Sequence, residues 1–414
     1  MSQKTIWYCH PYAGSPHEGM SYRPYYLAKY WKKAGHQAYV ISSSFHHLLH
    51  HPIEQKESIE KKEIEGVDYI RLKTPKYQNS NFKRILNMLN FAWKIKKHQK
   101  QLLAITGKPD VIIASSSHPF HYLSLYLIAK KHQIPLIFEV RDLWPSSLIE
   151  LLKLKPWHPL IVIFSLIEKH AYRHANEVVC LLEKAQPYMV SKGLNPEKFC
   201  YIPNGTDCEI QEEKNLPPTL EKTIQQLKDQ KKFLVGYAGA FGVPNAMEHF
   251  IQAMKIVQKS HPHIHALLIG QGQQKTSLMD YCREQHIHNV SFFEPISKTQ
   301  IHYFLKEMDI LYLGWQDTKL YQYGVSPNKI FDYMLAGRPI LESGGSPDSL
   351  IEFARCGQIC PAADSHHIAR SLIQMCEKNH EILLHLGEAA KKYVLKHHDY
   401  QIISQQYSKI FESN

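Results

Sequence analysis

The chain carries the same local order twice: a buried strand, a loop with glycines and then a helix. The first copy has a strand at Thr5–Cys9, a polar loop and a helix at Pro24–Ala34. The second has a strand at Phe233–Ala238, the loop GAFGVPN and a helix from about Ala246 to Lys259. This order is typical of the opening of a doubly wound α/β domain, where ligands bind at the loop. Because 414 residues suffice for two or three domains, the sequence predicts two similar α/β domains that face each other.

The stretch Tyr321–Glu342 is the strongest candidate for a ligand site. It predicts a loop, a helix that starts near Pro327 or Asn328, a turn and a strand. A helix N-terminus behind such a loop offers free N–H groups and the positive end of the helix dipole, which suit a phosphate. Lys329 adds a charge in the first turn, and Asp332 lies one turn deeper, where it can accept hydrogen bonds from a ribose diol. The alternative is an ordinary capped helix on an α/β sheet.

Residues Ser326–Leu341 resemble the sugar-nucleotide motif of retaining glycosyltransferases of family 4, whose pattern reads roughly spnKlfeYmaaGkPil. The resemblance is closest to the branch that builds bacterial O-antigen and capsule polysaccharides, which includes N-acetyl-fucosamine transferases. It implies a GT-B fold of two Rossmann-like domains, with a C-terminal helix that crosses back to the first. It also implies that Asp332 binds the ribose hydroxyls. Many members have Glu at the place of Gly324, so the donor-sugar contact of that Glu is not carried over. The donor loop implied by the match consists of Ser326, Pro327, Asn328 and Lys329.

The loop after the first strand resembles the first βαβ unit of the same family, where it faces the acceptor and the donor phosphates. It holds Gly19 and Arg23 but lacks the GxGxxG spacing, so dinucleotide binding is not supported. The resemblance assigns Gly19 to the donor site and Arg23 to a phosphate or acceptor contact. The alternative for Arg23 is a solvated helix start.

The sequence RDLWP, from Arg141 to Pro145, directly follows a predicted buried strand. Charged residues at that place lie at the ligand edge of a parallel sheet. Most family 4 members have a His near this point, whereas the similar branch has a comparable rDlWP. We expect Asp142 to accept or position the proton of the acceptor hydroxyl, and Arg141 to hold a phosphate. The alternative is an Arg–Asp pair that fixes a turn.

The second glycine loop contains Gly239 and Gly242, which permit close backbone approach. In the family this loop binds the donor diphosphate, and many members have Arg and Lys a few residues later. Here Val243 and Asn245 stand at those places. The diphosphate charge is therefore left to Lys329, to helix dipoles and to Arg141 or Arg23 of the other domain.

The resemblance covers nearly the whole chain and suggests its domain boundaries. The turn IPNGTD closes the first domain, which gives an acceptor-binding domain at 1–205 and a nucleotide-sugar-binding domain at 206–395. A C-terminal helix at 396–414 returns to the first domain. The segment FFEPIS resembles the loop whose backbone, around Pro295 and Ile296, holds the base.

Composition favours an intracellular protein with an anionic partner. The formal charge of +11 favours a nucleotide, an anionic membrane or a nucleic acid. The eight cysteines show no CxxC, which indicates a reducing cytosol. No signal peptide is apparent, and no apolar run approaches the roughly 20 residues that span a bilayer. We therefore expect a cytoplasmic protein that can also lie on the inner face of the cell membrane.

Two stretches are candidates for membrane contact. Residues 69–109 contain ten Lys or Arg and no Asp or Glu, and residues 82–103 include an apolar helical stripe. Such a helix can lie on an anionic membrane, or it can bury the stripe in its own core. Residues 153–168 are either an interfacial anchor or the start of a helix, and the sequence leaves open which of the two stretches, if either, meets a membrane. The stripe consists of Phe82, Ile85, Leu86, Leu89 and Trp93.

We expect neither a metal nor another cofactor. The sequence has no DxD, HExxH, Walker lysine loop or GxSxG. Two histidine pairs lack an acidic third ligand and favour a solvated polar loop over a metal site. The pairs are His46 with His50 and His47 with His51.

The resemblance implies a metal-independent, retaining transferase that moves a sugar, of the N-acetylated hexosamine type, from a UDP-sugar to a hydroxyl of a lipid-linked saccharide. Its partners are then the nucleotide sugar, the lipid-linked acceptor and an anionic membrane, but not a nucleic acid. Two alternatives remain open. One is a UDP-sugar 2-epimerase on the same scaffold, and the other is a non-catalytic basic protein that binds membranes or nucleic acids.

Overall fold

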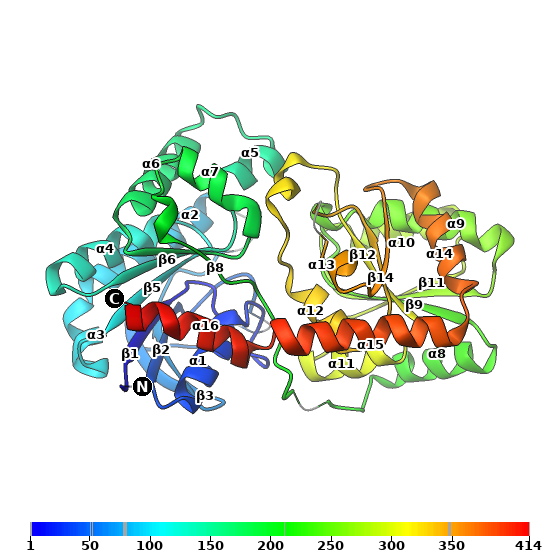
Figure 1. Ribbon diagram of the computed structural model, residues 1–414, viewed down its shortest axis with the longest axis horizontal. Coiled ribbons are helices and arrows are strands. Elements are labelled where there is room, and N and C mark those ends of the chain that lie inside the picture. Colours follow the sequence, from blue (N-terminus) through cyan, green and yellow to red (C-terminus); the bar gives the residue numbers. More distant parts are fainter. Residues whose placement is uncertain are drawn as a thin grey trace. The chain divides into compact units, whose positions relative to one another are not determined.

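The chain folds into two compact units, whose elements appear in chain order in Figure 1. The N-terminal unit comprises residues 1–204 and 400–414, and the C-terminal unit comprises residues 205–399. Each unit is built on one mostly parallel sheet, which confirms the predicted doubly wound α/β architecture. The structure is a computed structural model that describes residues 2–49, 51, 53–77, 81–210, 212–346 and 349–413.

The sheet of the N-terminal unit has the strand order β3-β4-β2-β1-β5-β6-β7-β8. Its neighbouring strands are parallel except for β3 and β4, which are antiparallel. The elements of this unit are β1 (Thr5–Cys9), α1 (Arg23–Lys33), β2 (Gln37–Ser43), β3 (Ile59–Ile64), β4 (Val67–Leu72), α2 (Asn81–Lys97), α3 (Gln99–Thr106), β5 (Val111–Ser116), α4 (Phe120–His132), β6 (Leu136–Val140), α5 (Ser146–Leu152), α6 (Pro159–His174), β7 (Glu177–Cys180), α7 (Gln186–Ser191), β8 (Phe199–Tyr201) and the last helix of the chain, α16 (Tyr400–Ser413).

The β3–β4 hairpin is absent from the sequence prediction. β3 reads IEKKEI, and its four central residues are exposed, so it lacks the apolar run that marks a buried strand. The turn consists of Glu65 and Gly66, which both have positive φ angles, of 49° and 80°. Such a pair is typical of the two-residue turns that join antiparallel strands. The charged strand lies at the edge of the sheet, where Lys and Glu hinder pairing with another chain.

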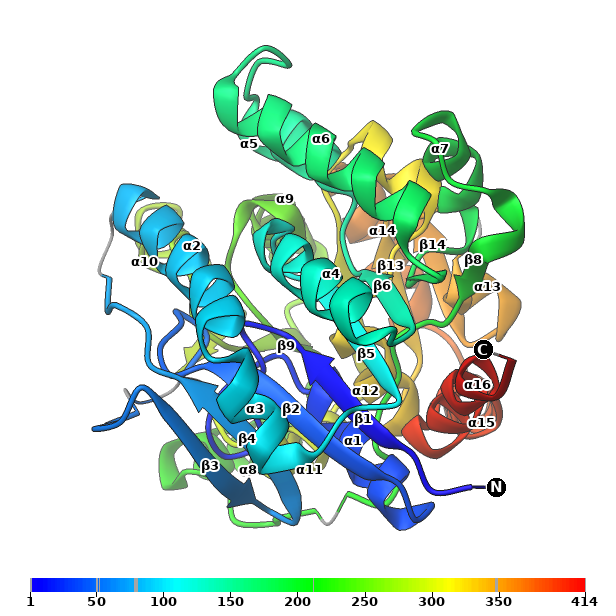
Figure 2. The ribbon, with the colours of Figure 1, turned by 90° about the vertical axis from the view of Figure 1, so that its left-hand side faces the viewer.

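Right-handed crossovers decide which face of this sheet each helix covers. The chain moves one way along the sheet from β4 to β5, β6 and β7, and the other way from β1 to β2. α2, α4 and α6 therefore cover one face, while α1 and α16 cover the opposite one (Figure 2). The rings of Tyr26 and Tyr400 stack at 5.0 Å, and those of Trp31 and Tyr407 meet at 5.5 Å. The last helix thus packs on the N-terminal unit, as the predicted fold requires.

The sheet of the C-terminal unit has the strand order β11-β10-β9-β12-β13-β14. Successive residues of β9 face two different helix layers: Leu234 packs in one apolar cluster and Val235 in the other. The elements of this unit are α8 (Pro218–Asp229), β9 (Phe233–Ala238), α9 (Met247–Ser260), β10 (Ile264–Ile269), α10 (Lys275–Glu284), β11 (Val290–Phe293), α11 (Lys298–Lys306), β12 (Ile310–Gly314), α12 (Asn328–Leu335), β13 (Ile340–Ser343), α13 (Leu350–Phe353), β14 (Gly357–Cys360), α14 (Ser365–Cys376) and α15 (His380–His397).

None of the helices within the described ranges is long and apolar enough to cross a membrane.

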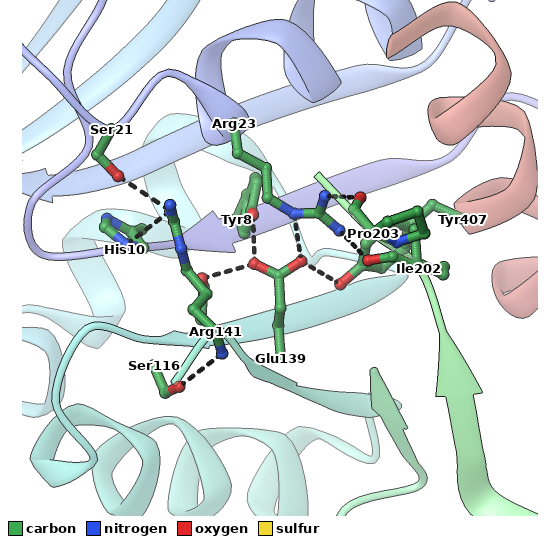
Figure 3. A network of polar contacts seen from close by, with 11 residues as sticks. Tyr8, His10, Ser21, Arg23, Ser116, Glu139, Arg141, Ile202, Pro203 and Tyr407 are labelled. Atoms are coloured by element: carbon green, nitrogen blue, oxygen red, sulfur yellow. Dashed lines mark hydrogen bonds and ion pairs between the residues drawn. The ribbon is translucent and has the colours of Figure 1, made fainter. Parts of the chain in front are cut away.

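Arg23 and Glu139 form a buried ion pair inside the N-terminal unit (Figure 3). Arg23 Nε donates to Glu139 Oε2 at 2.9 Å, and neither side chain has exposed surface. Burial alone would raise the pKa of Glu139, but the charges of Arg23 and Arg141 hold that pKa below its ordinary value. Glu139 also accepts hydrogen bonds from the hydroxyls of Tyr8 (2.6 Å), Ser115 (2.7 Å) and Tyr407 (2.9 Å).

All three nitrogens of the Arg23 guanidinium donate hydrogen bonds within the protein itself. Its Nη1 donates to the carbonyl oxygen of Pro203 at 2.5 Å, and its Nη2 to that of Ile202 at 3.1 Å. This placement corrects the sequence-based assignment of Arg23 to a phosphate or acceptor contact, because a fully buried side chain offers no donor to a ligand. It also corrects the alternative of a solvated helix start. The helix position was predicted, but the partner, 116 residues away, was not.

We expect Arg23→Met to lower the free energy of unfolding of the N-terminal unit by about 3–5 kcal/mol, because it leaves the Glu139 carboxylate buried without its cation. Chemical denaturation followed by tryptophan fluorescence measures this loss, since the buried Trp7 and Trp31 report on the same unit. The matched control is Lys32→Met, which removes a partly exposed partner of Asp68 and is expected to cost at most about 1 kcal/mol. Equal losses in the two variants would contradict the central role of the buried pair.

Candidate active site

The carboxyl ends of four neighbouring strands gather the polar side chains of the N-terminal unit. His10 follows β1, His46 follows β2, His118 follows β5 and Arg141 follows β6. The chain reverses direction along the sheet between β1 and β5, and such a switch point is where doubly wound sheets bind ligands. The predicted pair Arg141 and Asp142 therefore lies at the ligand edge of this unit.

Arg141 is oriented by the loop that follows β1 and by the last residue of β5. Its backbone N–H donates to Ser116 Oγ at 3.2 Å, and its Nη1 donates to Ser21 Oγ at 2.9 Å. The same Nη1 lies 3.1 Å from His10 Nε2. Burial and the charge of Arg141 hold the pKa of His10 well below its usual range, so this imidazole is neutral at pH 7. Asp142 is exposed as a residue, but desolvation of its carboxyl group raises its pKa above the ordinary value, although the charge of Arg141 opposes this rise.

Gly19 is a packing residue of the loop after β1. It has a φ of 152°, and a Cβ there would lie 2.3 Å from the carbonyl oxygen of Leu48. The glycine allows this loop to pair with the one after β2, through a bridge to Leu49. Gly19 is itself buried, and the structure shows it in a packing role. Its contact with the donor stays a prediction.

A cluster of buried aromatic and imidazole rings lies under this edge. The ring of Tyr12 is 5.6 Å from that of His46 and 5.7 Å from that of His118, which is 5.2 Å from His121. Burial lowers the pKa of His46 to about 3 and that of His121 to about 4. The imidazoles are therefore neutral near pH 7.

The described residues contain no group of three or more His, Cys, Asp or Glu side chains placed to hold a metal ion. His46 belongs to the buried cluster rather than to a solvated loop. Its predicted pair partner His50 lies outside the described residues.

The N-terminus of α12 is the corresponding feature of the C-terminal unit. The helix starts after Pro327, which is its N-cap residue and has no side-chain group that could cap the first turn. This start agrees with the predicted one near Pro327 or Asn328. Tyr333 fixes the helix to the sheet, because its hydroxyl accepts from the N–H of Ala238, at the end of β9, at 2.8 Å.

Lys329 reaches from this helix to the glycine loop after β9. Its Nζ donates to Asn245 Oδ1 and lies 3.4 Å from the hydroxyl of Tyr237. Asn245 is itself anchored to the carbonyl oxygen of Ala240 at 2.9 Å. A Cβ on Gly239 would lie 3.5 Å from Lys329 Cδ. The structure therefore brings the predicted donor residues Gly239 and Lys329 together.

Two aromatic rings face the ammonium group of Lys329. Its Nζ lies 4.9 Å from the centre of the Tyr237 ring and 5.7 Å from that of Trp315, contacts that favour the cation. Burial lowers the pKa of Lys329 to about 7. An anion beside the ammonium group would raise this pKa again.

Asp332 is buried behind the N-terminus of α12. Its Oδ1 accepts from Thr206 Oγ1 at 2.9 Å, its Oδ2 accepts from Lys298 Nζ, and His302 Nε2 lies 3.6 Å away. An ionised carboxylate has about four acceptor sites, so these bonds leave some for ligand hydroxyls. The ribose contact of Asp332 stays a prediction, but it would have to share the carboxylate with Lys298.

The segment predicted to hold the base is fixed by the helix that follows it. Ser297 caps α11 through a reciprocal pair of hydrogen bonds with Gln300. Pro295 is exposed and Ile296 is half-buried, so the backbone of this segment lies at the surface of the unit. Gly242, in the glycine loop, is half-buried.

Two family models together match most of the chain. Glycosyltransferase Family 4 matches residues 18–210, and Glycosyl transferases group 1 matches residues 232–378. The chain belongs to glycosyltransferase family 4. It is similar to the probable glycosyltransferase WbjE of Pseudomonas aeruginosa, with 22% identity over 315 residues, which are 73% of this chain and 75% of WbjE.

Solved structures resemble the whole chain. Sucrose-phosphate synthase of Thermosynechococcus elongatus has a TM-score of 0.75 at 13% identity, over 99% of both chains. HepE of Anabaena, in complex with UDP and glucose, has a TM-score of 0.69 at 14% identity, over 100% of both chains. WaaG, a glycosyltransferase involved in lipopolysaccharide biosynthesis, has a TM-score of 0.69 at 14% identity, over 99% of this chain and 100% of WaaG. These likenesses confirm the GT-B fold.

Several residues of this family 4 site were missed by sequence reasoning. In the sequence, Asn245 stands where many family members have a cationic residue, and only that difference was noted. In the structure its side chain holds Lys329 in place. Lys298 and Thr206 carried no motif, and their contacts with Asp332 span 34 and 126 residues. Such contacts depend on the tertiary fold, and a single sequence gives no signal for them.

Glu342 is a further buried carboxylate near the predicted donor residues. Its Oε1 accepts from Trp315 Nε1 at 2.8 Å, and its Oε2 accepts from Ser349 Oγ. Burial raises the pKa of Glu342 to about 7. The carboxylate fixes the indole that lies against Lys329 and that meets the ring of Tyr321 at 5.3 Å.

We expect the N-terminal unit to lose stability in acid through its buried imidazoles. The pKa of His121 is lowered to about 4, whereas a histidine in an unfolded chain titrates near about 6.5. Below that pH the unfolded state binds more protons, so stability falls as the pH falls. The expected contribution of His121 is about 2 kcal/mol between about pH 7 and about pH 5.

Denaturation of the His121→Gln variant at both pH values tests this contribution. The variant should lose less stability on acidification than the wild type, because it lacks one imidazole that takes up a proton on unfolding. Glu168 of the same unit, whose pKa burial raises to about 7, titrates in both proteins and cancels in the comparison. His51→Gln, at an exposed site, should behave as the wild type. Identical acid losses in all three proteins would contradict the prediction.

Proposed function

We propose that this family 4 glycosyltransferase moves an N-acetylated hexosamine-type sugar from a UDP-sugar to a hydroxyl of a lipid-linked saccharide. The observation that carries the proposal is the placement of Lys329 beside Gly239, in the first turn of α12, whose N-cap residue is Pro327. This arrangement suits a diphosphate. HepE, which shares the fold, has been solved with UDP and glucose, and this supports the choice of a UDP-sugar.

The proposed reaction retains the configuration at the anomeric carbon and needs no metal. The bond from that carbon to the β-phosphate oxygen of UDP breaks, and a bond to the acceptor oxygen forms on the same face. The acceptor proton passes to the departing phosphate oxygen. Lys329 and the first N–H groups of α12 stabilise the leaving diphosphate, a role that metal ions fill in other enzymes.

We assign the remaining predicted residues as follows. On the C-terminal unit, Asp332 holds the ribose, and the backbone at Pro295 and Ile296 holds the base. On the N-terminal unit, Arg141 and Asp142 serve the acceptor, Arg141 as a phosphate contact and Asp142 by orienting the hydroxyl. The exposure of Asp142 and the fixed guanidinium of Arg141 support these roles. A place in surface polysaccharide synthesis is supported by the likeness to WbjE and WaaG.

A panel of nucleoside diphosphates tests the donor assignment. We expect UDP to raise the melting temperature of the protein more than GDP, dTDP, CDP or ADP, and the shift to be the same with and without EDTA. A shift that EDTA abolishes would contradict the metal-free proposal. A flat panel would contradict the nucleotide site, and turnover of the UDP-sugar without an acceptor would favour the epimerase.

We expect the affinity for UDP to fall as the pH rises above about 7, by up to about tenfold per pH unit, because the free enzyme then loses the proton on Lys329. Uridine should show no such dependence, since it lacks the phosphates. Titration calorimetry in buffers of different ionisation enthalpy also reports the proton taken up. Lys329→Met should weaken UDP binding and flatten the profile, whereas Lys319→Met, at an exposed site of the same unit, should do neither. An unchanged profile in Lys329→Met would contradict the assignment.

A further inference from the structure

One face of the N-terminal unit exposes large apolar side chains along three neighbouring helices. On α2 they recur at the spacing of one helix side, and α4 and α6 repeat the pattern. Phe82 is 70% exposed and Leu166 is 62% exposed, so these side chains are far from buried. The stripe predicted on α2 is therefore not used in the core, which corrects that alternative. The exposed residues are Phe82, Leu86, Leu89 and Trp93 on α2, Leu123 and Leu127 on α4, and Val162, Ile163 and Leu166 on α6. We call them the α2–α4–α6 face.

The three helices form one continuous layer, visible in front of the sheet in Figure 2. Ser124 Oγ on α4 donates to the carbonyl oxygen of Ala92 on α2 at 2.7 Å. On its other side α4 meets α6 through Phe120 and Phe164, whose rings are 5.0 Å apart. Each helix connects one parallel strand to a later one, so all three run in the same direction, opposite to the strands.

Because the three helices run in the same direction, residues at corresponding places in their sequences lie at similar heights along the helix axes. In each helix exposed basic residues follow the exposed apolar ones, and α2 carries one more exposed lysine, Lys83, in its first turn. The helix N-termini lie at the carboxyl edge of the sheet, which also carries Arg141. The layer thus presents an apolar band next to the candidate site and a basic band behind it. The basic band consists of Lys96, Lys97, Lys130, Lys131, Lys169 and Arg173.

The charge of this face has a single sign. α2 and α4 contain no Asp or Glu, and the one acidic residue of α6, Glu168, is 3% exposed and accepts from Tyr172. Lys97 Nζ lies 4.5 Å from the centre of the Trp93 ring, so the ammonium group itself faces the exposed indole in a cation–π contact. An apolar surface bordered only by cations matches the headgroup region of an anionic bilayer. A second copy of the chain would bring two basic faces together, which like-charge repulsion disfavours.

We propose that the α2–α4–α6 face lies flat on an anionic membrane, with its apolar band inserted among the lipids. Residues 82–103 and 153–168 then act together, and α4, which the sequence did not single out, joins them. The inference rests on the proposed function only in that a lipid-linked acceptor would be presented at this surface. Membrane binding through this face would bring such an acceptor close to the carboxyl edge of the sheet, which bears Arg141 and Asp142.

Flotation with lipid vesicles tests the proposal. The full-length protein should float with vesicles rich in phosphatidylglycerol, bind less at high salt, and bind weakly to pure phosphatidylcholine. The variant Leu86→Ser/Leu89→Ser/Trp93→Ser should lose at least about tenfold in vesicle affinity. Leu127→Ser and Leu166→Ser should each weaken binding, which a single membrane helix would not predict. All substituted side chains are exposed, so the fold should be retained.

The matched control is Phe353→Ser/Ile382→Ser/Leu384→Ser, which removes equally exposed apolar side chains from the C-terminal unit and should leave vesicle binding unchanged. The proposal is overturned if the wild type does not float, if both triple variants lose binding equally, or if light scattering shows a dimer that the α2 variant dissociates. The thermal shift with UDP is measured on the same proteins. A retained shift without flotation refutes the membrane face alone, and flotation without a shift refutes the nucleotide site alone.

Discussion

The buried pair of Arg23 and Glu139 is the interaction on which the N-terminal unit depends. Two charges without contact to water are tolerated only when every remaining donor and acceptor is satisfied. The carboxylate takes four hydrogen bonds, from β1, β5, α1 and α16, and the guanidinium holds the carbonyls of Ile202 and Pro203. One ion pair thus joins the first helix, three central strands and the last helix of the chain. Its removal disturbs elements that are far apart in sequence.

The two units hold a cationic side chain at the carboxyl edge of their sheets in different ways. In the C-terminal unit burial keeps the pKa of Lys329 low, and Asn245 accepts a hydrogen bond from its ammonium group. In the N-terminal unit Arg141 is fixed by Ser21 and lies over neutral imidazoles. Each unit thus holds one cation at the carboxyl edge of its sheet by hydrogen bonds to neutral side chains.

The sequence predicted what local patterns encode, namely the paired βα openings, the helix after Pro327 and the contact region of Lys329 and Gly239. It failed where a residue's role depends on a distant partner. Arg23 resembled a ligand contact because it follows the loop after the first strand, where the family binds ligands. Its guanidinium is instead paired with Glu139. The stripe on α2 has the spacing of a core helix, and only the structure shows that it faces outward. The charged edge strand β3 lacked any apolar signal.

The chain passes between its units twice, and the two passages are tied to each other. The N–H of Thr206 donates to the carbonyl oxygen of His398 at 3.0 Å, and Thr206 also holds Asp332. On the other side, Arg23 clamps the carbonyls of Ile202 and Pro203. Any reorientation of one unit against the other must therefore be absorbed by a few backbone torsions between these anchors. Because Thr206 belongs to this short hinge, a change in the hydrogen bonding of the Asp332 carboxylate would act directly on the linker.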